Sequence, residues 1–159
     1  MSAKALARGG IIAALYALLT VALAPISSGL FQCRVSEALS VLPWFTPAAV
    51  PGLFLGCLLG NLLTGAPVYD VVFGSLATLL AALLALLLRK RGGSKYLAPL
   101  PSVVCNAVVI GILMVRVYAL PVGYLAAMLY VAAGQAVACY GLGLPLLFAL
   151  ERFGGRLFH

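Results

Sequence analysis

Acidic residues are nearly absent from this chain of 159 residues, which has three Asp and Glu against ten Lys and Arg. Charged residues make up 8% of the sequence and hydrophobic residues 65%, and the mean hydropathy is +1.19. No water-soluble core needs that much apolar sequence. The apolar runs are continuous, which excludes the period-two pattern of an outer-membrane barrel. The composition therefore predicts an all-α membrane protein with several transmembrane helices.

Catalytic and metal-binding motifs are missing as well. The single histidine is His159, no HExxH sequence occurs, and none of the four cysteines forms a CxxC pair. Residues 92–95 lack the spacing of a phosphate-binding GxxxxGK[ST] loop. No nucleophile has an evident base. We therefore expect no enzyme activity, no metal and no cofactor in this chain, and a membrane enzyme has the weakest support among the alternatives.

Positive charge is confined to a few places. Positively charged loops stay on the cytoplasmic side of a membrane, so blocks of basic residues should share one side. The net charge of +7 also suggests nucleic-acid binding, but no separate basic domain exists, and we expect no nucleic-acid partner. The blocks are Lys4 with Arg8, then Arg89, Lys90, Arg91 with Lys95, then Arg152 with Arg156, and only Arg34 and Arg116 lie elsewhere.

Five apolar stretches can each cross a hydrocarbon layer, which needs about 20 helical residues. They cover residues 9–25, 47–63, 68–88, 97–117 and 121–150. Three of them separate the first two basic blocks, and this odd number places the blocks on opposite sides. A further crossing is needed, and we assign it to Val35–Trp44, which spans about 15 Å as a helix. So short a helix has to be shielded by its neighbours.

The resulting prediction is one transmembrane domain over residues 1–159, a bundle of six helices with a short second helix and both termini cytoplasmic. The first span resembles a signal peptide, but Pro25 directly follows the small residues of the would-be cleavage site. We therefore interpret it as a retained helix. In the last span, Pro145 and the glycines before it predict a kink near the C-terminal end.

The acidic residues stand out, because an ionisable side chain at the centre of a membrane helix costs about 2.5–3.5 kcal/mol. Glu151 adjoins Arg152 at the cytoplasmic end and is ordinary. Glu37 and Asp70 each begin a helix that is predicted to run inward, so both lie near the outer face. Interaction with the helix dipole is an alternative to a binding role for each. For Glu37, an ion pair with Arg34 is a further alternative.

Polar side chains also occur inside the apolar stretches. Such amides often join helices, for about 0.6–2 kcal/mol each. We expect this role for Asn61, and leave it open beside a binding role for Asn106 and Gln135. Together with the acids they predict a polar site in the outer half of the bundle, suited to a small, flat molecule with donors and acceptors. The candidate substrate-binding residues are Gln32, Arg34, Glu37, Asp70, Asn106 and Gln135.

The first apolar stretch carries small residues at a spacing of four, namely Gly9, Ala13 and Ala17. Such a face allows another helix to approach closely in lipid. Packing within the bundle and docking of another membrane subunit both explain it, and the sequence does not distinguish them.

The sequence resembles the QueT family from about residue 11 to about residue 145. Members of this family are substrate-binding (S) components of energy-coupling factor (ECF) transporters. The most specific matches are Gln32-x-Arg34-x-Ser36-Glu37-Ala38-Leu39, Asp70-x-x-Phe73-Gly74-Ser75-x-x-Thr78, and Leu100-Pro101 with Asn106.

This resemblance implies a six-helix subunit in the bacterial cell membrane that binds a 7-deazaguanine precursor of queuosine: the 7-cyano compound, the 7-aminomethyl compound or queuine. It implies a transmembrane coupling subunit and two cytoplasmic ABC ATPases as partners, with ATP used by the ATPases. It gives Gly9, Ala13 and Ala17 the role of contacting the coupling subunit, and places residues 32–37 in a loop over the ligand. Relatives often have Glu where this chain has Gln135, which leaves the preferred precursor open.

A stand-alone secondary carrier for a small polar heterocycle is the alternative function. In that case Glu37 or Asp70 would relay protons.

Overall fold

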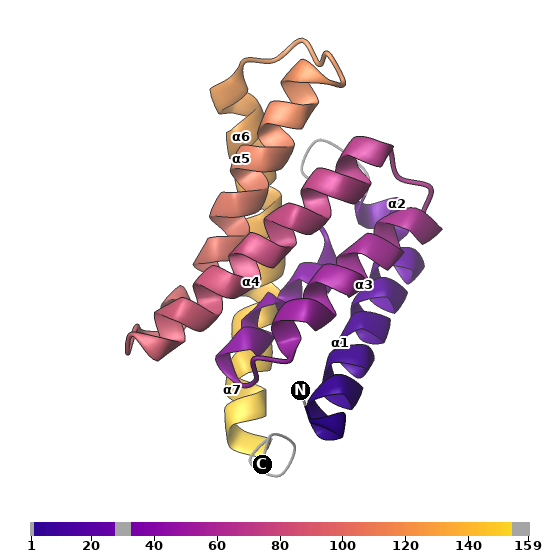
Figure 1. Ribbon diagram of the computed structural model, residues 1–159. Helices are drawn as coiled ribbons and strands as arrows, with labels where there is room; N and C mark the ends of the chain where they lie inside the picture. Colours follow the sequence, from indigo (N-terminus) through magenta and orange to yellow (C-terminus); the bar gives the residue numbers. More distant parts are fainter. Residues whose placement is uncertain (1, 28–32, 154–159) are drawn as a thin grey trace.

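The structure of the chain is a computed structural model that describes residues 2–27 and 33–153 (Figure 1). These residues form helices joined by short turns, and none of them forms a β-strand. Elements η1 and η3 are 3₁₀-helices, whereas η2 and η4 are π-helices. In chain order the elements are α1 (Ala3–Ala22), α2 (Ala24–Ser27), η1 (Val35–Trp44), α3 (Ala49–Leu63), η2 (Asp70–Gly74), α4 (Ser75–Lys90), η3 (Lys95–Leu97), α5 (Leu100–Arg116), α6 (Tyr124–Ala136), η4 (Val137–Gly143) and α7 (Leu144–Phe153).

Four helical segments among the described residues are long and apolar enough to cross a membrane. They are α1, η2 with α4, η3 with α5, and α6 through α7, while α3 is apolar but shorter. These segments overlap the five apolar stretches expected from the sequence. The chain is therefore a multi-pass membrane protein, and the predicted all-α membrane class is confirmed.

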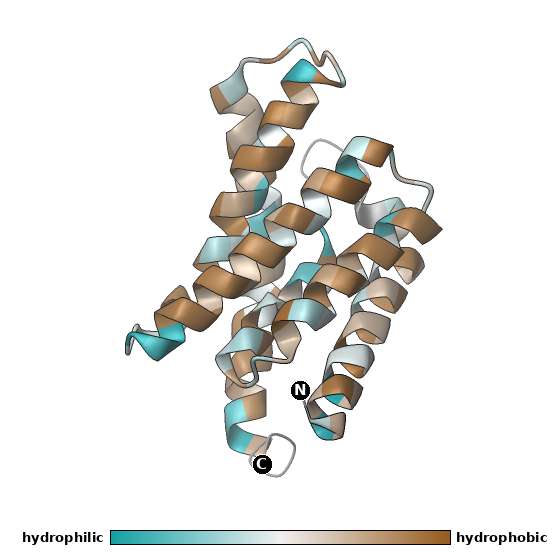
Figure 2. Cartoon of the chain, viewed as in Figure 1, coloured by the Kyte–Doolittle hydropathy of each residue, from teal (hydrophilic) through white to brown (hydrophobic). Residues whose placement is uncertain are grey.

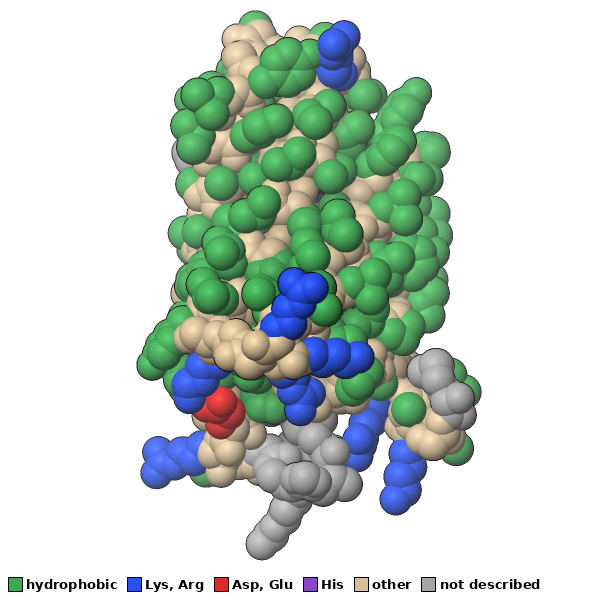
Figure 3. Space-filling view, turned by 60° about the vertical axis from the view of Figure 1, so that its left-hand side comes forward, with side chains coloured by type: hydrophobic (Ala, Val, Ile, Leu, Met, Phe, Trp, Pro, Cys, Tyr) green, Lys and Arg blue, Asp and Glu red, His purple; other side chains and the backbone are tan. Residues whose placement is uncertain are grey.

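The basic residues gather at one end of the molecule. The beginning of α1 and the end of α7 both lie toward the bottom of Figure 1, and Figure 3 shows Lys and Arg side chains concentrated at its lower end. A 2.7 Å ion pair between Lys95 and Glu151 joins the α4–α5 connection to α7 at this end. The apolar helices therefore extend away from one charged end, as the positive-inside pattern requires.

Element η1 coincides with the short helix predicted over Val35–Trp44. Its residues from Ser36 to Pro43 are buried, and it contacts α1, α3, α4, η4 and α7. Protein therefore surrounds this helix, as the predicted crossing by only ten residues requires. The count of six crossings and the cytoplasmic location of both termini stay predictions.

Helices α1 and α3 approach closely through three glycines of α3 at a spacing of four, Gly52, Gly56 and Gly60. A Cβ atom at Gly56 would lie 2.6 Å from the Cβ atom of Tyr16 and 2.8 Å from the carbonyl oxygen of Ala13. Real Cβ atoms do not come so near to other atoms, so the contact needs glycine. Close approach through small residues is the main attraction available to helices in lipid.

This contact bears on the small-residue face of α1. Gly9, Ala13 and Ala17 are all buried in the described chain, and Gly9 and Ala13 lie against the glycines of α3. A partner could not reach Gly9 and Ala13 without displacing α3. The structure therefore supports the alternative that this face packs within the bundle, and it gives no support to the docking of a coupling subunit there.

Two π-helical segments interrupt the long helices. Segment η4 lies where a kink was predicted, and Pro145 follows it in the first turn of α7. Proline has no N–H to donate and its ring collides with the carbonyl group four residues earlier. The wider π turn before Pro145 accommodates this mismatch. Segment η2 begins at Asp70, so each π-helix adjoins polar residues of the interior.

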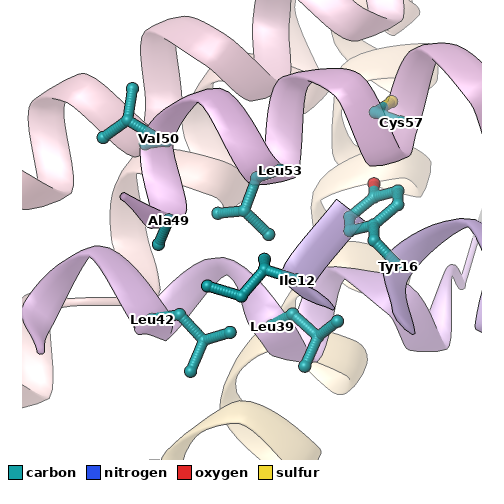
Figure 4. Close-up of a cluster of buried hydrophobic side chains, with 9 residues drawn as sticks. Ile12, Tyr16, Leu39, Leu42, Ala49, Val50, Leu53 and Cys57 are labelled. Carbon is teal, nitrogen blue, oxygen red and sulfur yellow. The ribbon is translucent and has the colours of Figure 1, made fainter. Parts of the chain in front are cut away.

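The interior changes from apolar to polar along α1. Ile12 packs with Leu39, Leu42 and Leu53 in an apolar cluster, and Tyr16 closes that cluster on one side (Figure 4). The hydroxyl group of Tyr16 points away from Ile12, on the side where Cys57 lies (Figure 4). Hydrophilic segments accordingly occur inside the bundle as well as at its ends (Figure 2).

Replacing Gly56 with Ala should destabilise the protein by about 1–3 kcal/mol, because the added methyl group forces α1 and α3 apart. Thermal unfolding in detergent measures the effect. Gly10→Ala is the matched control, since a Cβ atom at Gly10 meets nothing within 4 Å. Equal stability of both variants would contradict the close contact.

Candidate functional site

Glu37 provides a carboxylate at the centre of the bundle, with only 1% of its surface exposed. The Tyr16 hydroxyl donates a hydrogen bond to Glu37 Oε1, and Thr78 Oγ1 lies 3.4 Å from the same oxygen. The amide of Asn106 is near enough to interact with the carboxylate. Glu37 Oε2, in contrast, has no hydrogen-bond partner among the described residues. One oxygen is held by the protein and the other is left to accept.

The two alternatives to a binding role for Glu37, interaction with the helix dipole and an ion pair with Arg34, fit its contacts less well. Its side chain is held from α1 and α4 instead of acting only on its own helix. Within the described part of the chain no ion pair joins it to Arg34. Arg34 Nη1 donates instead to Asn61 Oδ1 at 2.9 Å. The structure thus does not support a direct Arg34–Glu37 ion pair, although the two charges interact.

Asp70 is a second buried carboxylate, 8% exposed, at the first residue of η2. Its Oδ1 atom has no hydrogen-bond partner in the described residues. Its carbonyl oxygen accepts from Asn61 Nδ2 at 3.1 Å. Asn61 therefore joins α3 to η2, as expected, and its amide oxygen also holds Arg34. The amide fixes Arg34 relative to Asp70.

Asn106 and Gln135 lie side by side on α5 and α6, with 3.4 Å between Asn106 Nδ2 and Gln135 Oε1. Both are buried, at 4% and 2% exposure. Cys139 Sγ lies 3.7 Å from Gln135 Oε1 and 3.6 Å from the carbonyl oxygen of Glu37. The amide pair is thereby connected to the helix that carries Glu37.

Tyr118 enters the cluster from the connection between α5 and α6. Its hydroxyl oxygen is buried and lacks a hydrogen-bond partner among the described residues. Burial, together with the nearby negative charge of Asp70, raises the pKa of Tyr118 to about 12. The phenol therefore keeps its proton at neutral pH, and it can both donate and accept a hydrogen bond.

Most of the predicted site residues share one region. Arg34, Glu37 and Asp70 interact electrostatically, and Asn106 and Gln135 adjoin Glu37 as described above. A role for them in binding stays a prediction. Gln32 lies outside the described residues, so its place relative to the cluster is not established.

Sequence reasoning missed Tyr16, which stands in an apolar run. A signal was available, because Thr20 lies four residues later and so shares the same helix face. Thr20 Oγ1 lies 2.9 Å from Ser36 Oγ and joins α1 to η1. For Tyr118, as for Tyr69 and Tyr124, the sequence suggests only ring stacking near the site, because a tyrosine at the end of a span is usually an interfacial anchor.

The ionisable side chains of the cluster include more acids than bases. The cluster holds one cation, Arg34, and two carboxylates, Glu37 and Asp70, so its formal charge is −1 (+1 − 2) when all three are ionised. The unpartnered atoms include one oxygen from each carboxylate. Such a site can recognise a neutral or cationic molecule that presents several N–H donors.

Two comparisons with known proteins find the same family. A family model described as QueT transporter matches residues 6–152. The chain is 39% identical, over 88 residues, to the queuosine precursor transporter QueT of Lactococcus lactis subsp. cremoris (strain MG1363). That alignment covers 54% of this chain, and the chain spans about half of that relative, 52% of its length. No solved structure matches the chain.

Tyr16→Phe should destabilise the protein by about 1–3 kcal/mol, because it removes a buried donor from the Glu37 carboxylate. Unfolding followed in detergent tests this. Tyr69→Phe is a suitable control, since Tyr69 is 52% exposed. A Tyr16→Phe variant as stable as the Tyr69 control would show that the hydroxyl does not hold Glu37.

Proposed function

The chain belongs to the QueT transporter family, and from this premise we propose that it is the membrane-embedded substrate-binding subunit of an ECF-type importer. Its substrate is a 7-deazaguanine precursor of queuosine, and it lies in the bacterial plasma membrane. The name of the Lactococcus relative supports this class of substrate. The motifs around Glu37, Asp70 and Asn106 support the S-component assignment.

The observation that carries the proposal is the free oxygen of Glu37. A guanine-type ring presents a ring N–H and an exocyclic amino group along one edge, and a carboxylate accepts two such parallel bonds. Glu37 Oε2 is buried with no partner among the described residues, while Oε1 is oriented by Tyr16. The carboxylate is therefore preorganised to accept an N–H group of such an edge at Oε2.

Donors for the opposite part of the ligand come from the same cluster. A ring carbonyl accepts hydrogen bonds, and the side chains of Arg34, Asn106 and Gln135 carry N–H groups. Asn61 restrains Arg34, which lowers the entropy lost when the guanidinium group orders around a ligand. Gln32 is the remaining candidate of this group.

The proposed topology has six helices, with η1 as the short second one and both termini in the cytoplasm. Glu37 and Asp70 then lie toward the outer face, because the elements that begin near them run toward the charged end of the molecule. Ligand enters from outside. The concentration of basic side chains at the charged end of the molecule, where α1 begins and α7 ends, supports this orientation (Figure 3).

Energy for uptake is proposed to come from partners. The sequence has no GxxxxGK[ST] loop for ATP. A transmembrane coupling subunit and two cytoplasmic ABC ATPases would supply it, and this chain binds no cofactor itself. The docking face is not assigned to Gly9 and Ala13, because α3 covers them.

Glu37→Gln should weaken binding of 7-deazaguanine compounds by more than about tenfold, since a hydrogen bond to a charged group contributes about 1.5–3 kcal/mol. Titration calorimetry with the purified protein measures the affinity, and Glu151→Gln is a matched control at the charged end. Unchanged affinity in the Glu37 variant would remove this residue from the binding site.

Uptake of labelled 7-deazaguanine precursors into proteoliposomes should require the coupling subunit and ATPases together with ATP. The chain alone should bind ligand without accumulating it. Robust accumulation by the chain alone under a proton or sodium gradient would contradict the proposal and identify a secondary carrier instead.

A further inference from the structure

Asp70 and Tyr118 bring two unsatisfied polar atoms to a second place in the cluster. Asp70 is more than nine-tenths buried, and its Oδ1 atom has no hydrogen-bond partner among the described residues. The buried hydroxyl of Tyr118 also lacks one, although it lies close enough to Asp70 to feel its charge. No hydrogen bond among the described residues joins either side chain to Glu37, so the pair forms a separate recognition point.

The Tyr118 hydroxyl and the Asp70 carboxylate interact, and neither the hydroxyl oxygen nor Asp70 Oδ1 has its hydrogen-bonding capacity satisfied by another described residue. A phenol that donated to Asp70 Oδ1 would satisfy both atoms at once, and an unsatisfied buried group costs about 1–3 kcal/mol. A group that donates to the carboxylate and also reaches the phenol oxygen would satisfy both. A primary ammonium group has three N–H donors and no acceptor, which fits this pair of acceptors.

The charges of the cluster favour a cation at this place. Among the described residues, Arg34 is the cation that acts on Glu37 and also interacts with Asp70. One positive charge cannot neutralise both carboxylates when both are ionised. The Nη1 group of Arg34 is already directed to Asn61. A buried charge without a counterion is costly, so one further positive charge beside Asp70 would balance the cluster.

We propose that Asp70 and Tyr118 form a second subsite that binds the ammonium group of a cationic ligand. A flat heterocycle would contact Glu37 along its N–H edge and direct a protonated aminomethyl substituent to Asp70 and Tyr118. The chain therefore prefers 7-aminomethyl-7-deazaguanine to the neutral 7-cyano compound. This inference rests on the proposed function, and it assigns the selectivity to two residues that are not needed for recognition of the ring edge.

Three probes separate the two parts of the site: 7-aminomethyl-7-deazaguanine, 7-cyano-7-deazaguanine and unsubstituted 7-deazaguanine. For the wild-type protein in detergent, calorimetry should give at least about tenfold tighter binding of the aminomethyl compound, the factor expected for a charge-assisted bond. Asp70→Asn should abolish that preference and leave the affinities for the other two probes within about threefold of wild type. This variant keeps the shape of the side chain and removes its charge.

Tyr118→Phe provides an independent variant should Asp70→Asn fail to fold. It should weaken binding of the aminomethyl compound alone, by about three- to tenfold, as loss of one neutral hydrogen bond implies. Tyr124→Phe is the control, because the Tyr124 ring is 5.8 Å from the Arg116 guanidinium carbon and lies at the start of α6.

The outcomes distinguish this inference from the function on which it rests. Binding of no probe by the wild-type protein would overturn both. Binding of all three with equal affinity, or a preference for the cyano compound, would overturn the subsite and leave the function standing. So would an Asp70→Asn or Tyr118→Phe variant that weakens all three probes alike, since that pattern indicates a structural role.

Discussion

A carboxylate buried in a lipid-embedded bundle has to be surrounded by polar groups of the protein, and Glu37 imposes this requirement on its neighbours. Water is scarce at membrane depth, so each lone pair is satisfied by a side chain, by a ligand or not at all. Tyr16 from α1 and Thr78 from α4 meet one oxygen, and Cys139 from η4 approaches the Glu37 backbone. The polar residues of the helices converge because this charge lies at their centre.

The apolar part of the molecule places those polar groups. Tyr16 can reach Glu37 because α1 lies against the glycines of α3, where Gly56 admits the Tyr16 side chain at its Cβ atom. The same packing keeps the apolar cluster of Ile12 and Leu53 together beside the ring (Figure 4). A shift of α1 would therefore disturb the carboxylate without any change in a polar residue.

The sequence predicted the parts of the fold that depend on hydropathy and charge. Five apolar stretches and the short helix Val35–Trp44 follow from runs of apolar residues and from the distribution of Lys and Arg, which are local or additive signals. The approach of Glu37, Asp70, Asn106 and Gln135 could be anticipated because polar groups in membrane helices face the interior. Which atoms pair could not, since that depends on helix rotation.

Three particular features show where sequence reasoning stopped. The glycines of α3 have the same spacing of four as the small residues of α1, but only the structure shows that the two faces meet. Arg34 stands three residues before Glu37 and yet bonds to Asn61, because the backbone before η1 is extended and not helical. The chain position of Tyr118 does not indicate that its hydroxyl interacts with Asp70.

The neutral side chain of Gln135 bears directly on the charge of the site. With an amide at that position, the formal charge of Arg34, Glu37 and Asp70 is −1 when all three are ionised, and a monocation balances it. A carboxylate there would raise the deficit to two charges and would also compete with Glu37 for the amide of Asn106, which now lies 3.4 Å from Gln135 Oε1. The amide therefore leaves Asp70 as the acid best placed to act as a counterion, because the Oε1 oxygen of Glu37 is already bound to Tyr16 and its other oxygen faces the ring edge in the proposed complex.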